Sequence, residues 1–280
     1  MKSFIRFLSA VLFCASVMFA PADAVAHQRL DALALQDSYN HAAEVGLPAA
    51  YYISVSARLI PVGSKEPPPA FIKEGLGSGF VVLPNGLLMT KMHVVNPLFQ
   101  AQGSTLIAPN KLKLQNGDIL ELFITVSTKA GVLYSALLIA GNPVDEVDLA
   151  LLKIESAKGE KFSFAEIADG VVGYDPVITI GNPLGIPFTV SSGMVSNPDI
   201  VMFGRHFLQT NALMAPGSSG GMVLRLSDHK VVGMTEWIFR RTDENGVVVG
   251  PDVDLGFATQ ASVLQKFLND ELRKNPSLAK

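Results

Sequence analysis

The sequence predicts an all-β protein made of two small antiparallel β-barrels, with one helix before them and another after them. Three observations lead to this fold class: about a dozen short β-type runs, their division into two groups near residues 156–164, and the scarcity of helical patterns between them. The composition suits a folded chain, because 49% of the 280 residues are hydrophobic and only 17% are charged.

The N-terminus predicts a signal peptide over residues 1–24. Lys2 and Arg6 provide a positive region, residues 7–19 are almost wholly apolar, and Ala22-Asp23-Ala24 has the small-x-small pattern of a cleavage site. We therefore expect an exported protein, either periplasmic or secreted. The sole cysteine, Cys14, lies inside this segment, so the mature chain is expected to have no disulfide and no cysteine-bound metal.

A helix is predicted next, over residues 28–46, where Gly46 followed by Pro48 ends the helical pattern. This helix could pack on its own barrel or join copies of the chain into a homo-oligomer, and the sequence leaves both open. A second helical pattern covers residues 259–272. The predicted divisions are a signal peptide at 1–24, an N-terminal helical segment at 25–49, a first barrel at 50–156, and a second barrel with the C-terminal helix at 157–280.

The predicted strands follow one another closely. The first group covers residues 51–56, 79–83, 87–90, 111–114, 119–127, 136–140 and 149–154. The second group covers residues 176–180, 189–196, 206–210, 221–226, 231–238 and 255–258. The dipeptides Asn85-Gly86 and Asn116-Gly117 lie between neighbouring runs and predict tight hairpin turns.

Charge and hydropathy limit the partners that we expect. The chain has 22 basic and 25 acidic residues, a net charge of −3, which argues against binding nucleic acid through its phosphates. No apolar run of membrane-spanning length follows the N-terminal segment, so no membrane span is expected in the mature chain. A metal-dependent hydrolase is disfavoured because the sequence has no His-Glu-x-x-His pattern, and we expect neither a metal nor a cofactor.

Three segments carry residue types that suit nucleophilic catalysis. His93 follows a strand, Asp148 opens an apolar run, and Ser219 lies in Gly217-Ser218-Ser219-Gly220-Gly221. The order His, Asp, Ser is the chain order of the Ser-His-Asp triad on double β-barrels. A serine hydroxyl needs a neighbouring imidazole to take its proton, and a carboxylate orients that imidazole. The backbone N–H groups of Gly217 and Ser219 could stabilise the developing oxyanion.

Eight motifs make the chain resemble the trypsin-like serine endopeptidases of the bacterial HtrA/Deg type. They lie at residues 77–80, 90–95, 148–153, 180–185, 189–196, 209–212, 216–221 and 256–258. The resemblance implies two six-stranded β-barrels with a catalytic cleft between them. It also implies His93 as general base, Asp148 as its orienting carboxylate, Ser219 as nucleophile, and an oxyanion hole at Gly217 and Ser219.

The chain departs from that type in two respects. Lys91-Met92 stands before the histidine, where small or asparagine residues are common. The chain also ends at Lys280, about 20 residues after the last motif, so we expect no PDZ domain. We expect an exported serine endopeptidase that hydrolyses proteins or peptides through an acyl-enzyme. The alternative is a protease-like fold that binds peptides or proteins with little or no turnover.

A substrate pocket is expected beside the nucleophile, by the same resemblance. Its wall maps to residues 212–216 and to Met234-Thr235-Glu236, and Leu213 takes the position at the base where a carboxylate would select arginine or lysine. Leu213, Met214 and Met234 would make this pocket apolar and favour cleavage after small or medium aliphatic residues. In the alternative, Leu213 and Met234 belong to the barrel core. An inward Glu236 carboxylate would instead admit a basic side chain.

Overall fold

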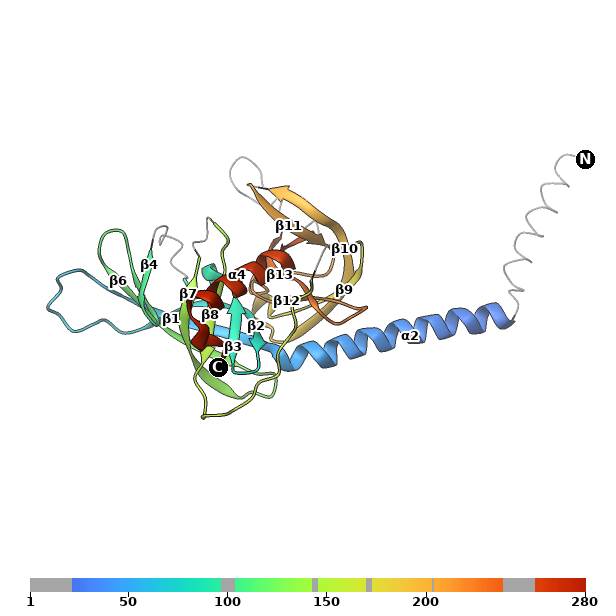
Figure 1. Ribbon diagram of the computed structural model, residues 1–280, viewed down its shortest axis with the longest axis horizontal. Coiled ribbons are helices and arrows are strands. Elements are labelled where there is room, and N and C mark those ends of the chain that lie inside the picture. The colour runs from blue at the N-terminus through green and yellow to red at the C-terminus, as the bar shows by residue number, and fades with distance from the viewer. Residues whose placement is uncertain (1–21, 97–103, 143–145, 170–172, 203, 239–254) are drawn as a thin grey trace, which may run out of the picture. The chain divides into compact units, whose positions relative to one another are not determined.

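The structure is a computed structural model that describes residues 22–96, 104–142, 146–169, 173–202, 204–238 and 255–280 (Figure 1). Most of the predicted signal peptide therefore lies outside the described residues. The chain forms two compact units, one up to His41 and one from Ala42 to Lys280. No helix among the described residues has both the length and the apolar character needed to cross a bilayer.

Helix α2 (Ala22–Gly46) is longer than the helix predicted at 28–46 and begins at the predicted cleavage sequence. Its last residue, Gly46, lies where a side chain would not fit. A Cβ atom there would lie 2.4 Å from Leu224 Cδ1 and 2.5 Å from Ile180 Cδ1. The 3-10 turn η1 (Leu47–Ala49), which contains Pro48, then leads into the first strand.

The first barrel closes through six antiparallel strands: β1 (Ala50–Ile60), β2 (Ile72–Leu83), β3 (Leu87–Thr90), β8 (Ala150–Ile154), β7 (Leu133–Gly141) and β6 (Ile119–Ser127). Closure comes from the pairing of β6 with β1, which runs from Tyr52 opposite Ser127 to Ile60 opposite Ile119. The short strands β4 (Thr105–Ala108) and β5 (Lys111–Lys113) extend the sheet beyond β6. Both predicted hairpin turns are present, with Gly86 and Gly117 in the left-handed region at φ +84° and +91°.

The second barrel closes in the order β9 (Pro176–Gly181), β10 (Thr189–Met202), β11 (Arg205–Thr210), β14 (Gly256–Gln260), β13 (Val231–Ile238) and β12 (Met222–Arg225). Helix α4 (Ala261–Lys274) follows β14 and packs against β13 and β14 with Leu264, Phe267 and Leu268 buried. The 3-10 turn η3 (Pro276–Ala279) ends the chain. The predicted fold class, two six-stranded antiparallel barrels with an N-terminal helix and a C-terminal helix, is confirmed.

Each barrel has its own apolar core. The first core is formed by alternating inward residues of its strands, which include Ile53, Val81, Leu120, Ile124, Leu138 and Leu152, all 1% exposed or less. The second core is smaller and includes Val177, Val195, Leu208, Val223, Val232 and Ala258. Strands β1 and β2 contact β9, so the two barrels meet along one side of each. The candidate site lies along this junction.

Candidate active site

His93 lies on α3 (Met92–Val95), a single helical turn that follows β3. The helix is anchored because Met92, Val94 and Val95 are buried, while the His93 side chain keeps 19% of its surface exposed. His93 Nδ1 lies 2.6 Å from Asp148 Oδ2, and the His93 backbone N–H donates to Asp148 Oδ1 at 2.9 Å. The two sequence-predicted residues therefore meet through two contacts.

Asp148 is held in an unusual backbone conformation just before β8. Its φ of +55° is in the left-handed region, which aspartate tolerates better than most residues. Its carbonyl accepts from the Met92 N–H at 3.3 Å, so α3 binds both the main chain and the side chain of Asp148. Burial alone would raise the pKa of Asp148. The hydrogen bond and charge of His93, with the charge of Lys91, outweigh burial and hold that pKa below its ordinary value.

Ser219 lies in the turn between β11 and β12, and β2 of the first barrel holds this turn in place. The Ser78 N–H donates to the Ser219 carbonyl at 2.9 Å, and the Ser78 hydroxyl donates to the Gly217 carbonyl at 2.8 Å. The Thr235 hydroxyl on β13 donates to the carbonyls of Ser218 and Gly221. The turn is thus bonded to both barrels.

Two glycines let the turn approach its neighbours closely. Gly217 and Gly220 have φ values of +97° and +88°, which residues with a side chain rarely adopt. A Cβ on Gly217 would lie 2.5 Å from the Asn182 carbonyl oxygen, and one on Gly220 would lie 2.1 Å from the Ser78 carbonyl oxygen and 2.5 Å from Thr90 Oγ1. Ser219 is therefore held against the strand that leads to His93.

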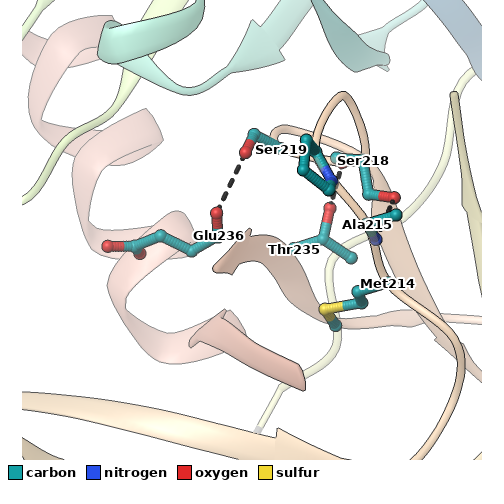
Figure 2. Close-up of a pocket in the computed structure, with 7 residues that line it drawn as sticks. Met214, Ala215, Ser218, Ser219, Thr235 and Glu236 are labelled. Carbon is teal, nitrogen blue, oxygen red and sulfur yellow. Dashed lines mark hydrogen bonds between the residues drawn. The ribbon is translucent and has the colours of Figure 1, made fainter. Parts of the chain in front are cut away.

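The two adjacent serines of this turn differ in orientation (Figure 2). The Ser218 hydroxyl accepts from the Ala215 N–H at 3.2 Å, inside the turn. The Ser219 hydroxyl donates to the Glu236 backbone carbonyl at 2.9 Å. Neither the Gly217 N–H nor the Ser219 N–H forms a hydrogen bond within the described part of the chain. Both amides are thus available to an added acceptor.

Ser78 and Asn182 are site residues to which sequence reasoning assigned no role. The Ser78 hydroxyl accepts from the Asn182 N–H at 2.9 Å and from its side-chain amide at 3.0 Å. The same amide donates to the carbonyls of Tyr51 and Gly77. Both residues stand in motifs that carried the family resemblance, at 77–80 and 180–185. That association was the only signal in the sequence.

A pocket of about 220 Å³ opens beside Ser219. Its lining consists of Met214, Ala215, Pro216, Ser218, Ser219, Thr235 and Glu236. Of the residues expected there, Met214, Thr235 and Glu236 line it, but Leu213 and Met234 do not. Leu213 is 49% exposed, and Met234 is fully buried in the second barrel.

The Glu236 carboxylate turns away from Ser219 (Figure 2). It forms ion pairs with Lys91 Nζ at 2.5 Å and with Arg205 Nη1 at 2.8 Å. The negative charge that could have drawn a basic substrate side chain is therefore matched by two cations of the protein itself. Among the described residues, no group of three or more metal-ligating side chains converges on one point.

The chain belongs to the trypsin-like peptidase domain family, whose sequence profile matches residues 77–234, more than half of the chain. Among curated proteins it is similar to a probable DegP-like periplasmic serine endoprotease of Rickettsia conorii, with 33% identity over 213 residues, covering 73% of this chain and 35% of that protein. It is also similar to the magnetosome formation protease MamE of Paramagnetospirillum magneticum, with 32% identity over 205 residues, covering 71% of this chain and 24% of MamE.

A third relative, a probable DegP-like periplasmic serine endoprotease of Brucella suis, is 31% identical over 204 residues, which cover 71% of this chain and 33% of that protein. The chain thus spans about a third or less of the length of these relatives. The resemblance to trypsin-like proteases of the HtrA/Deg type is confirmed. The matched range 77–234 contains His93, Asp148 and Ser219.

Proposed function

We propose that this chain is an exported serine endopeptidase that hydrolyses proteins or peptides through Ser219, His93 and Asp148. The observation that carries the proposal is the doubly bonded His93–Asp148 pair, which lies beside a serine turn fastened to both barrels. Two of the relatives are named as probable periplasmic serine endoproteases. These names support both the proposed activity and export after cleavage of the signal peptide.

The proposed reaction begins with transfer of the Ser219 hydroxyl proton to His93 as Oγ attacks the scissile carbonyl. The amides of Gly217 and Ser219 donate to the oxyanion, and each such donor contributes about 3 kcal/mol to lowering the barrier. His93 then protonates the leaving amine, and water hydrolyses the acyl-enzyme by the same route. Asp148 stabilises the imidazolium and stays ionised, as its lowered pKa requires.

The Ser219 hydroxyl has one proton, and in this structure it uses that proton to donate a hydrogen bond to the Glu236 backbone carbonyl. Catalysis therefore requires Ser219 to rotate so that this proton is directed at His93. The same observation favours a second candidate function, a protease-like module that binds peptides with little turnover. The endopeptidase and the binding module differ in whether substrate binding brings about this rotation of Ser219.

The pocket supports cleavage after small or medium aliphatic residues. Met214, Ala215 and Pro216 provide apolar lining, and the carboxylate of Glu236 is already paired with Lys91 and Arg205. A substrate lysine or arginine would be buried without a partner, at a cost of several kcal/mol. Dominant cleavage after lysine or arginine in a peptide-library digest would contradict this specificity.

Digestion of casein by residues 25–280, compared with Ser219→Ala, tests the proposed function. We expect wild-type hydrolysis that rises between about pH 6 and 8, where an ordinary histidine loses its proton. Ser219→Ala should fold normally and lose essentially all activity, whereas the matched variant Ser218→Ala should keep most of it. Equal turnover in wild type and Ser219→Ala would refute the proposal. Peptide binding without turnover by wild type would support the binding module instead.

A further inference from the structure

Lys91 is a lysine whose whole side chain is buried at the junction of the barrels, with 0% of it exposed. Its ammonium group lies 2.5 Å from Glu236 Oε2 and donates to the Thr259 hydroxyl, which in turn donates to Glu236 Oε2 at 2.6 Å. Lys91 belongs to the first barrel, at the start of α3, while Glu236 and Thr259 lie on β13 and β14 of the second. This ion pair therefore joins the two barrels.

Arg205, at the start of β11, completes the cluster. Its Nη1 lies 2.8 Å from Glu236 Oε1, and its Nη2 donates to Glu236 Oε2 at 2.9 Å. The same Nη2 donates to the Val147 carbonyl of the first barrel at 3.2 Å. The Glu236 carboxylate is thus held from two sides, and both of its cationic partners link it to the first barrel.

The cluster touches the chain next to each member of the triad. Lys91 lies two residues before His93, and Val147 lies one residue before Asp148. The backbone carbonyl of Glu236 is the acceptor of the Ser219 hydroxyl. Three segments that come from both barrels are therefore bonded to Glu236, two of them through its carboxylate and one through its backbone carbonyl.

We propose that Lys91, Glu236 and Arg205 act as positioning residues that hold the histidine, aspartate and serine segments in register across the barrel junction. The inference rests on the proposed protease function. Its physical basis is that a buried charge separated from its partner is strongly disfavoured, so the three side chains stay together and fix the spacing of the segments that carry them. Catalytic groups need such control, because a displacement of about 1 Å can reduce the rate by about 10²-fold.

Lys91 also contributes to the charge around the His93–Asp148 pair. The charged groups that interact with Lys91 are Glu236, Asp148 and Arg205. These four groups are two cations and two carboxylates, so their formal charges balance. Loss of Lys91 removes the cation that interacts with Asp148 and leaves excess negative charge beside His93, which favours the imidazolium.

The experiment compares Lys91→Met, Glu236→Gln and the double variant with Lys153→Met. Lys153 is a suitable control because it is a partly buried lysine on β8 that donates to the Asn85 carbonyl, away from the site. We expect Lys91→Met to lower kcat about 10²-fold with KM changed by less than about threefold. Lys153→Met should keep kcat within about twofold.

The pH profile separates positioning from a general loss of stability. The acidic limb of kcat/KM should move to higher pH in Lys91→Met. It should return near the wild-type position in the double variant, whose kcat stays low. The double variant also removes both buried charges together, so it keeps the test available if a single variant does not fold.

A second readout does not depend on turnover. A proton on His93 Nδ1 that is hydrogen-bonded to Asp148 should give a strongly downfield proton NMR signal in wild type and in Lys153→Met. That signal should shift or broaden in the folded double variant. If wild type lacks turnover but the signal responds in this way, the protease function is wrong and the positioning role stands. An unchanged NMR signal, an unchanged kcat, or an acidic limb of Lys91→Met that moves to lower pH would overturn the positioning role.

Discussion

Among the described residues, two histidine–aspartate pairs have nearly equal contact distances and very different surroundings. His93 and Asp148 are 2.6 Å apart with side chains 19% and 2% exposed, whereas His206 and Asp199 are 2.7 Å apart with side chains 56% and 54% exposed. The distance from the imidazole ring to the carboxylate therefore does not distinguish the two pairs.

The difference lies in what surrounds each carboxylate. Asp148 accepts from the backbone and the ring of His93, and its segment is bonded through Arg205 to the second barrel. Asp199, on the hairpin of β10 and β11, accepts from His206 and from the Gln260 side chain of β14. Burial and connection to a serine turn make one pair a candidate for catalysis, and their lack leaves the other a solvated surface contact.

The largest expected effect contrasts the two histidines. His93→Ala should lower kcat by about 10⁴-fold or more, because triad residues act as a unit, while His206→Ala should change it by less than about twofold. Peptide hydrolysis at pH 8, with circular dichroism to confirm folding, measures both. Similar losses in the two variants would remove the distinction between the pairs.

Ser78 sharpens the comparison, because its hydrogen bonds fasten the Ser219 turn to the first barrel, which carries His93 and Asp148. Ser78→Ala removes the hydrogen bond to the Gly217 carbonyl and leaves the Asn182 side-chain amide short of one acceptor. We expect kcat to fall about 10- to 100-fold as the turn loosens. Thr125→Ala is the control, because the Thr125 hydroxyl on β6 makes only a long 3.5 Å contact with the Ser54 carbonyl. Its kcat should stay near the wild-type value.

The smallest expected effect concerns acid stability. The pKa values of Asp148 and Asp199 are both lowered, so each carboxylate stabilises the fold above the ordinary aspartate pKa of about 3.9 and loses that contribution as the pH falls below it. Water screens the exposed Asp199, so its share should be small. Urea unfolding between pH 6 and 3 should show a weaker pH dependence in Asp148→Asn, while Asp199→Asn follows wild type. The reverse order would contradict this account of burial.

The sequence predicted the fold well because strand patterns and turn dipeptides are local. Its strand limits were less accurate. The run predicted to end at residue 196 continues as β10 to Met202, because two shifts of register with β11 accommodate Pro198. Similarly, β2 begins at Ile72 rather than at residue 79, because its pairing with β1 continues across a register shift and reaches Ile72 opposite Ala57.

The sequence predicted those parts of the candidate site that lie in recognisable motifs. His93 and Asp148 meet as the motifs implied, but Lys91 stood out only as an unusual residue before the histidine. Its partner Glu236 is 145 positions away, and Arg205, the other cation that pairs with Glu236, is 114 positions away. No local pattern reveals an ion pair formed only when two barrels meet. Likewise, no local pattern shows that Met234 is buried in the second barrel or that the exposed Leu213 lies outside the lining of the pocket beside Ser219.

Covalent labelling tests the central claim, that Ser219 is a nucleophile activated by the buried pair. The mature protein is treated with a fluorophosphonate and the modified serine is identified by peptide mass spectrometry. We predict one adduct, on Ser219, that forms equally in His206→Ala and is lost in His93→Ala and Ser219→Ala. A folded wild-type protein that gives no adduct, or an adduct on another serine that survives Ser219→Ala, would contradict the claim.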